Sequence, residues 1–315
     1  MLGSGSVAVS FHALLPFSIL HYNPLVRPLC PSLTRAIFAL GMFVLAASLV
    51  APQQAPPASG ARILLMPRKL ITGERATLAV LDINGRLTPG VEVKFSDGEK
   101  VTTDATGRAL FVAPLNPGTI TAGITGRAGH VTSTILSSAG LSASQETITG
   151  APLIASIADR FELAGEGFCG DADANHVTVG GLPGLVLASS PASLAVLPPA
   201  ELEPGPAEVN VTCGQKAAPT FIIVFISLEM ESKNGALAPG ERRELVVRVR
   251  GTTRRVTLEA HNLSADVADL SGGSIVRETS SGGADNTAKF ALVGKKHGNF
   301  TISIRLLSPL SAPRS

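Results

Sequence analysis

The segment that decides the fold is residues 151–213, APLIASIADRFELAGEGFCGDADANHVTVGGLPGLVLASSPASLAVLPPAELEPGPAEVNVTC. Short runs such as NHVTV at 175–179 and EVNV at 208–211 alternate apolar and polar residues. Gly and Pro separate these runs, for example at Gly180 and Pro204. Alternation with a period of two, bounded by turn residues, is typical of β-strands. The segment therefore predicts a small β-sandwich.

The composition of the whole chain extends this prediction. The 315 residues leave room for two or three domains of about 100–150 residues each. Val, Ile, Thr and Leu occur in short runs between turn residues, with 32 Gly and 22 Pro in total. Beyond residue 61 we find no periodicity of long helices. The chain is therefore expected to be all-β, and the absence of Trp separates it from antibody-type domains, which pack a Trp against their disulfide.

The charge balance excludes one class of partner. Lys and Arg total 26 against 24 Asp and Glu, which leaves a net charge of +2. Such a balance provides no basic field to hold a polyanion. We expect no binding of nucleic acid, and contact with a membrane only through the N-terminal segment.

The N-terminal residues 1–51 are predicted to be an export leader. Arg27 and Arg35 precede an uncharged apolar run at 36–51, AIFALGMFVLAASLVA, and residues 46–48 offer small side chains for cleavage. A positive flank, a short apolar core and a small-residue exit define a secretory signal. The run is shorter than the roughly 20 residues that span a bilayer, but an uncleaved anchor stays open as the alternative.

The rest of the chain divides into three predicted modules. Residues 52–61 are a Pro- and Ala-rich linker, and residues 137–150 form a second linker rich in Ser, Ala, Gly and Thr. The modules themselves are residues 62–136, 151–226 and 227–308. Each is predicted to be one β-sandwich.

The first module has strong hairpin patterns. Val91, Val93 and Phe95 alternate with polar residues, and the turns at 84–85 (Asn-Gly) and 97–98 (Asp-Gly) tolerate positive φ. This series of turns and strands resembles the bacterial immunoglobulin-like repeats of surface adhesins. It is also similar to the carboxypeptidase-regulatory-like sandwiches.

The second module resembles the IPT/TIG branch of immunoglobulin-like folds. The resemblance rests on an opening strand at 152–157, a Gly-rich turn at 165–168, a hairpin at 175–181 and a return strand at 204–211. It implies a module that binds or spaces and seldom catalyses. The third module matches no family, and its alternating runs predict another immunoglobulin-like sandwich.

The cysteines agree with export. Cys30 lies in the predicted leader, which leaves Cys169 and Cys213 inside the second module. Two cysteines in an exported chain favour one disulfide. Two unpaired thiols remain the alternative, because only geometry decides.

One cluster of oxygen donors has the spacing of a cation site. Asp171, Asp173 and Asn175 alternate as in the opening of an EF-hand loop. His176 stands where that loop needs Gly, and the closing Glu is missing. We therefore expect a solvated hairpin tip and no metal.

No pattern in the sequence specifies a reaction. The histidines are too scattered for a zinc site and are expected in loops or on the surface, and no nucleophile elbow of the G-x-S-x-G type occurs. Those downstream of the leader are His130, His176, His261 and His297. We predict a protein that is not an enzyme and needs no cofactor.

The predicted function follows from export and from modules that bind or space. The protein is expected in the periplasm, at the cell surface or outside the cell, in contact with a protein or a cell-surface polymer. The alternative is an accessory protein of a carbohydrate-active or peptidase system. Against sugar binding stands the scarcity of aromatic platforms, since the only Tyr, Tyr22, lies in the leader.

Overall fold

The computed structural model describes residues 7–10, 62–138, 146–231, 236–270, 274–280 and 286–307. Within these ranges the secondary structure consists of β-strands and one short 3₁₀ turn, η1 (Ala172–Ala174). The predicted all-β fold is therefore confirmed. No helix in the described ranges is long and apolar enough to cross a membrane. The apolar run at 36–51 and the linker at 52–61 lie outside the described residues.

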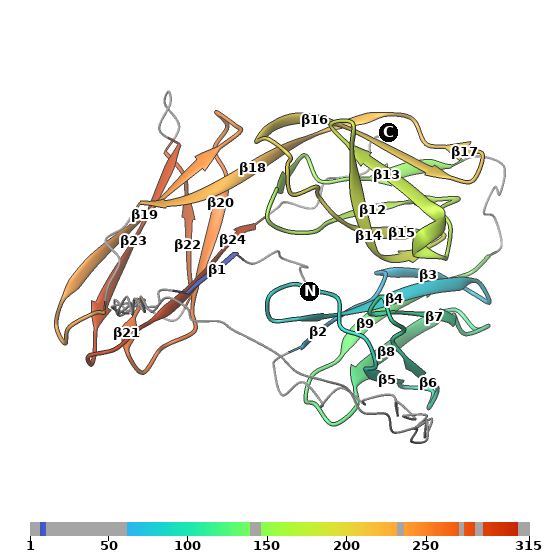
Figure 1. Cartoon of the computed structure of the whole chain (residues 1–315), viewed down its shortest axis with the longest axis horizontal. Coiled ribbons are helices and arrows are strands. Elements are labelled where there is room, and N and C mark those ends of the chain that lie inside the picture. The colour runs from blue at the N-terminus through green and yellow to red at the C-terminus, as the bar shows by residue number, and fades with distance from the viewer. Residues whose placement is uncertain are drawn as a thin grey trace, which may run out of the picture. The chain divides into compact units, whose positions relative to one another are not determined.

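Two sheets enclose the first hydrophobic cluster, and together they form the first sandwich (Figure 1). One sheet pairs β2 with β4 and β4 with β7, and the other has the order β3-β9-β8-β5-β6. The strands are β2 (Arg62–Leu65), β3 (Lys69–Ile71), β4 (Arg75–Asp82), β5 (Glu92–Phe95), β6 (Lys100–Thr102), β7 (Arg108–Val112), β8 (Gly118–Ile124) and β9 (Val131–Leu136). Phe95 and Phe111 come from opposite sheets, and their ring centroids lie 4.9 Å apart. Their contact shows that the alternating apolar positions of both sheets meet in one core.

The connection between β2 and β3 gives this sandwich its immunoglobulin-like character. β2 pairs antiparallel with β4 in one sheet, whereas β3, only three residues further on, pairs parallel with β9 in the other. The opening segment thus switches sheets at residues 66–68. Two antiparallel sheets packed face to face, with the chain crossing between them, are the architecture of immunoglobulin domains.

The second sandwich encloses its own hydrophobic cluster. One sheet has the order β10-β12-β15-β14, and the other joins β13, β16 and β18, with β11 and β17 at their sides. The strands are β10 (Thr147–Gly150), β11 (Ile154–Ser156), β12 (Phe161–Glu166), β13 (Asn175–Val179), β14 (Leu182–Ser190), β15 (Ser193–Leu197), β16 (Gly205–Cys213), β17 (Lys216–Ala217) and β18 (Phe221–Glu231). The predicted hairpin at 175–181 is present as β13 and the start of β14, joined at Gly180 and Gly181, both with positive φ.

β10 differs from the prediction for its segment. Residues 137–150 were expected to form a linker, yet 147–150 pair with β12. Ile148 packs against the second cluster, and Glu146 just before the strand is fully buried. The strand is only four residues long, Thr-Ile-Thr-Gly, and has no alternating apolar run, so the pairing depends on the neighbouring strand that the fold supplies.

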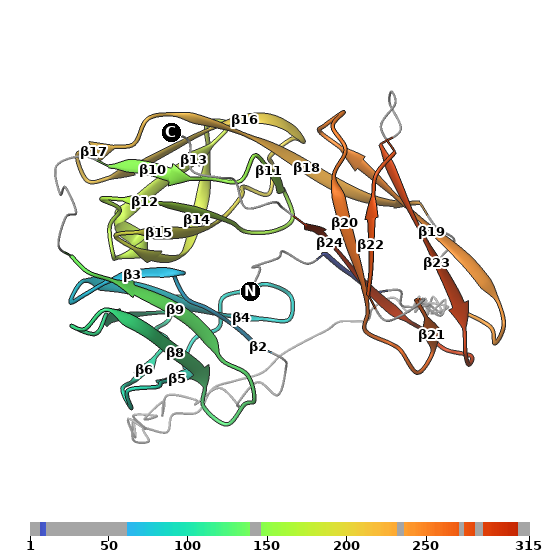
Figure 2. The same cartoon turned by 180° about the vertical axis from the view of Figure 1, so that it is seen from behind.

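The third sandwich begins within β18. One of its sheets has the order β18-β19-β23-β21, and the other has the order β1-β24-β20-β22. Its further strands are β19 (Arg242–Arg250), β20 (Thr257–Asn262), β21 (Ala268–Asp269), β22 (Ser274–Glu278), β23 (Thr287–Gly294) and β24 (Thr301–Leu307), and β1 (Val7–Ser10) pairs with β24. Figures 1 and 2 show β18 running from the second sandwich into the third.

β18 serves two cores because its side chains alternate. Ile223 and Phe225 are buried in the second cluster, whereas Ile226 belongs to the third cluster and Leu228 packs against it. The expected division between residues 226 and 227 thus falls inside a continuous strand. The division of the chain into three domains stays a prediction.

Candidate functional site

The predicted disulfide is present between Cys169 and Cys213. Cys169 follows the turn at Gly167, and Cys213 is the last residue of β16. β13 pairs with β16 so that Asn175 lies opposite Cys213, and this register places the two cysteine Cα atoms 5.6 Å apart. That separation lies within the usual range for a disulfide.

Asn175 does not lie in a solvated hairpin tip, as its segment was expected to do. It is 5% exposed, and its side-chain amide holds the preceding loop together. Nδ2 donates to the carbonyls of Cys169 and Asp171 and to Ser189 Oγ, while Oδ1 accepts from the Cys169 N–H. A buried amide must satisfy its hydrogen bonds internally, so this side chain has a structural role.

The two acidic residues of the loop point to different partners. Asp171 caps η1, accepting a hydrogen bond from the Asp173 N–H at 3.0 Å. Asp173 forms an ion pair with Arg108 of β7, and the Arg108 side chain is largely buried. The three oxygen donors therefore do not converge. Within the described ranges no group of three or more His, Cys, Asp and Glu side chains is placed to hold a metal ion.

The four histidines do not gather at one place. His130, His176 and His297 are exposed, as expected. His261 instead lies within β20, half-buried, with Nε2 3.1 Å from Glu259. Glu259 also forms an ion pair with Arg305 of β24. The sequence alone does not indicate the Glu259–Arg305 ion pair, because it depends on the pairing of β20 with β24.

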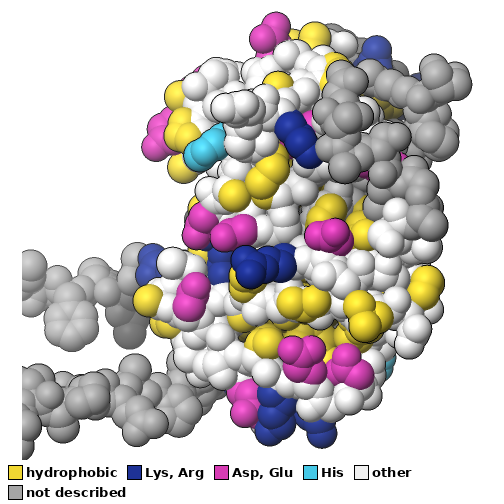
Figure 3. Space-filling model, turned by 90° about the vertical axis from the view of Figure 1, so that its right-hand side faces the viewer, with side chains coloured by type: hydrophobic (Ala, Val, Ile, Leu, Met, Phe, Trp, Pro, Cys, Tyr) yellow, Lys and Arg dark blue, Asp and Glu magenta, His cyan; other side chains and the backbone are white. Residues whose placement is uncertain are grey.

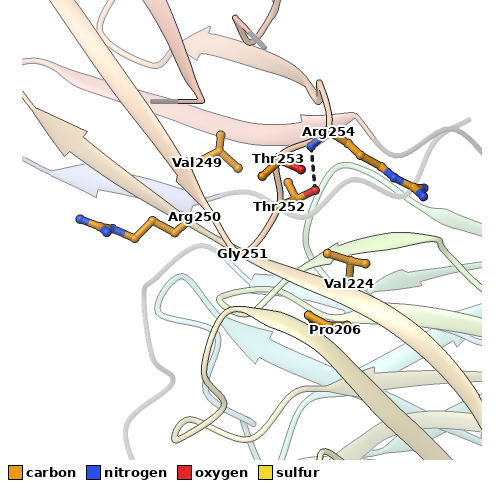
Figure 4. Close-up of a pocket in the computed structure, with 8 residues that line it drawn as sticks. All are labelled: Pro206, Val224, Val249, Arg250, Gly251, Thr252, Thr253 and Arg254. Atoms are coloured by element: carbon orange, nitrogen blue, oxygen red, sulfur yellow. Dashed lines mark hydrogen bonds between the residues drawn. The ribbon is translucent and has the colours of Figure 1, made fainter. Parts of the chain in front are cut away.

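A groove opens where β16 and β18 meet the turn between β19 and β20 (Figure 4). Its volume is about 510 Å³. Its lining residues are Pro206, Val224, Val249, Arg250, Gly251, Thr252, Thr253 and Arg254. No acidic side chain is among them. The wall is apolar, the floor is largely backbone and threonine, and two arginines stand at the rim.

Buried contacts set the shape of the turn that forms the groove. Asn286 Nδ2 donates to the carbonyls of Thr252 and Arg254, and the Arg254 N–H donates to Thr252 Oγ1 at 3.1 Å. Gly251 has a φ of 93°, and a Cβ at this position would lie 2.3 Å from the carbonyl oxygen of Phe225. Only glycine permits this approach of the turn to β18.

The two arginines leave the groove in opposite directions, as Figure 4 shows. Arg250 forms an ion pair with Glu229 of β18, and this hydrogen bond raises the pKa of Arg250. Arg254 is exposed. The side chains that line the groove can make apolar contacts and hydrogen bonds with a bound partner.

The outer surface carries both charges and scattered apolar side chains. Figure 3 shows one face on which Lys and Arg side chains alternate with Asp and Glu and with hydrophobic groups. Large hydrophobic residues exposed elsewhere in the described ranges include Leu110, Val112 and Leu115. On this face, positive and negative side chains are interspersed.

The groove could not be predicted from the sequence, because its lining residues do not form a continuous motif. Pro206 and Thr252 are far apart in the chain and meet only through the pairing of β16, β18 and β19. The Gly-Thr-Thr sequence at 251–253 is typical of a turn, but it does not indicate which strands pack beside that turn.

Comparisons with known proteins give a likeness of fold. No model of a known protein family matches the chain, and no curated protein matches its sequence. SGBP-B of the Bacteroides ovatus mixed-linkage glucan utilization locus, solved with a mixed-linkage heptasaccharide, is 10% identical, with 76% of this chain and 73% of that chain covered and a TM-score of 0.31.

Two structures of tandem immunoglobulin domains give similar values. Immunoglobulin domains 1–4 of Sidekick-1 are 12% identical over 75% of this chain and 74% of that chain, with a TM-score of 0.25. The N-terminal four Ig domains of Dscam1 isoform 6.44 are 10% identical over 77% and 71%, with the same TM-score of 0.25. These likenesses concern the immunoglobulin-like fold.

Proposed function

We propose that this chain is an exported, non-enzymatic protein whose tandem immunoglobulin-like sandwiches bind or space a macromolecular partner. The partner is a protein or a polymer of the cell surface, and the place of action is the periplasm, the cell surface or the medium. Within this proposal the second sandwich is an IPT/TIG module and the first a bacterial immunoglobulin-like repeat.

The Cys169–Cys213 disulfide is the observation that carries the proposal. Disulfides persist in oxidising compartments and are rare in the cytosol. Here both cysteines of the described chain are joined, and Asn175 and Ser189 hold the bonded Cys169 in place. A site built around a disulfide supports export.

The groove between β16, β18 and the β19–β20 turn is the surface that we assign to the partner. Its open shape suits an extended segment of a polymer or peptide better than an enclosed small molecule. Val224 and Val249 offer apolar contact, and the threonine hydroxyls and the rim arginines offer hydrogen bonds.

The test combines location with binding. Expressed with its leader in a bacterial host, the chain should leave the cytosol, and the purified mature protein should bind isolated cell envelopes. Thr253→Trp fills the groove and should weaken this binding about tenfold, a loss typical of a blocked contact. Thr132→Trp places the same side chain on the exposed face of β9 and serves as the matched control. Cytosolic retention, or equal binding by both variants, would overturn the proposal.

The alternative, an accessory protein of a carbohydrate-active or peptidase system, is tested in the same assay. Insoluble polysaccharide then replaces cell envelopes as the probe. Sugar platforms need exposed aromatic side chains, whereas Phe95, Phe111, Phe161 and Phe225 of the described chain are buried. This observation favours the first proposal.

A further inference from the structure

A loop of the second sandwich is docked on the first sandwich through one buried threonine. Thr77 of β4 is 3% exposed. Its Oγ1 donates to the Gly170 carbonyl at 2.8 Å and accepts from the Ala172 N–H at 3.0 Å. Thr77 also lies opposite Ser189 of β14 in a single antiparallel bridge. The hydroxyl of one sandwich thus satisfies two backbone groups of the other.

Gly170 allows the loop to approach β4 at backbone distance. A Cβ at this position would lie 2.0 Å from the Arg75 carbonyl oxygen and 2.6 Å from its carbon. These atoms belong to the backbone of Arg75, which pairs with Val112 of β7 in the sheet. They cannot move aside, so any side chain at residue 170 separates the loop from β4.

A second set of polar contacts lies further along the same junction. Ser190 Oγ and Ser193 Oγ both donate to the Lys69 carbonyl, at 2.5 Å and 3.2 Å. The Lys69 N–H donates back to Ser193 Oγ at 3.3 Å. Ser190 and Ser193 are buried. If the sandwiches parted, both serines would lose their bonds to Lys69, and Ser190 Oγ would keep those that it accepts from the Ala192 and Ser193 N–H groups.

The apolar part of the junction is small. Three of its six buried residues are alanines, and both sandwiches contribute. They are Leu65, Ala79, Leu81, Leu187, Ala188 and Ala195. Alanine buries little area, so this cluster contributes less than a domain core. The junction therefore depends on its polar contacts being held in register.

The disulfide lies at the root of the docked loop. Cys169 directly precedes Gly170, and its carbonyl accepts hydrogen bonds from Ser189 Oγ and Asn175 Nδ2. Through Cys213 the loop is tied to β16, opposite Asn175. Without that bond, residues 169–174 would be held by their hydrogen bonds, by the ion pair of Asp173 with Arg108 and by the small buried side chain of Ala172.

We propose that the Cys169–Cys213 disulfide locks the first sandwich onto the second, and that a dithiol releases the first sandwich by reducing it. The dithiol supplies two electrons and two protons. The S–S bond breaks, two thiols form, and the dithiol closes into its own cyclic disulfide. Residues 169–174 then gain freedom, and the contacts to Thr77 weaken first.

Amide hydrogen exchange followed by NMR tests this proposal, with dithiothreitol as the dithiol. The Lys69 amide reports the junction at a point remote from the disulfide. The Val80 amide, bonded to Gly107, reports the first sandwich alone, and the Gly180 amide, bonded to Glu208, reports the second. On reduction the Lys69 amide should exchange about tenfold faster or more, while the Val80 and Gly180 amides keep their protection.

A variant with the disulfide intact separates the junction from the stability of the second sandwich. Gly170→Ala should release the Lys69 amide without dithiothreitol, and reduction should then add little. Gly150→Ala, where the new Cβ meets only ordinary contact with Ala164 at 3.5 Å, is the matched control and should behave as wild type. An unchanged Lys69 amide in reduced wild type, or in Gly170→Ala, would overturn the proposal.

Discussion

At the scale of single residues, Glu146 is an acidic side chain in an environment that disfavours its charged form. Its side chain is fully buried beside β16 and β17, and within the described residues neither carboxylate oxygen has a hydrogen-bond partner of good geometry. Burial raises the pKa of Glu146 to about 7, and the backbone of Cys213 and Ala218 and the Lys216 ammonium lower it again only in part. The carboxyl is thus protonated more readily in the folded chain than in the unfolded one.

Glu146 should make the protein less stable as the pH rises. Below the ordinary pKa of 4.5 the carboxyl is neutral in both states, and between pH 4.5 and about 7 only the unfolded chain loses the proton. Stability should therefore fall across this window, by up to about 3 kcal/mol. Glu146→Gln should remove the fall and be the more stable protein at pH 8, as measured by urea unfolding.

A matched control isolates Glu146 from other buried carboxyls. Burial also raises the pKa of Asp159 and of Glu162, so the wild-type profile contains their contributions as well. The difference between wild type and Glu146→Gln removes them. Glu201→Gln, at an exposed position, should keep the wild-type slope. Parallel profiles for wild type and Glu146→Gln would contradict the prediction.

At the scale of elements, β18 determines how the second and third sandwiches are connected. It pairs with β16 through Phe221–Phe225 and with β19 through Ser227–Glu231. A flexible linker would let the two units move independently, whereas a shared strand transmits strain between packed cores. We expect the second and third sandwiches to unfold together.

Ser227→Pro should uncouple them. Ser227 lies opposite Arg250 at the start of the β18–β19 ladder, and proline supplies no N–H there and restricts φ. The change should cost about 2–3 kcal/mol and split one calorimetric transition into two. Ser227→Thr keeps the N–H and suits a strand, so it should leave the transition single. A single transition in both variants would show that the shared strand is not what couples the cores.

At the scale of the whole molecule, the predicted leader bears on the third sandwich. The predicted leader covers residues 1–51 and therefore includes β1, which pairs with β24. Removal of the leader would take this partner strand from the edge of β24. The predicted cleavage would therefore also change one sheet of the third sandwich.

N-terminal sequencing of the protein recovered outside the cytosol tests the leader. The mature chain should lack about 50 residues, since the small-residue exit follows the apolar run. Replacing Ala46 and Ser48 by bulky residues should block cleavage and leave the chain attached to the membrane. A mature protein that still begins near Met1 would favour the anchor.

The sequence by itself determined the all-β fold and named the two cysteines of the expected disulfide, whose pairing only geometry could decide. Val91, Val93 and Phe95 alternate with polar residues and are buried as that period requires, and Asn-Gly and Asp-Gly turns depend on local φ alone. The disulfide was inferred from the number of cysteines and the expected compartment. Strand alternation and turn geometry depend on residues adjacent in the chain, and the expected disulfide depends on the number of cysteines. The linear sequence is therefore sufficient to predict them.

Only the tertiary structure decided what the polar residues do. Asn175 was expected in solvent, but the pairing of β13 with β16 and the docking of the loop on β4 bury it. The groove at Gly251, the pKa of Glu146 and the bonds of Thr77 to Gly170 all join segments distant in the chain. The burial and desolvation of a polar side chain depend on which strands pack against it. The alternation of apolar and polar residues within one strand does not specify those partner strands.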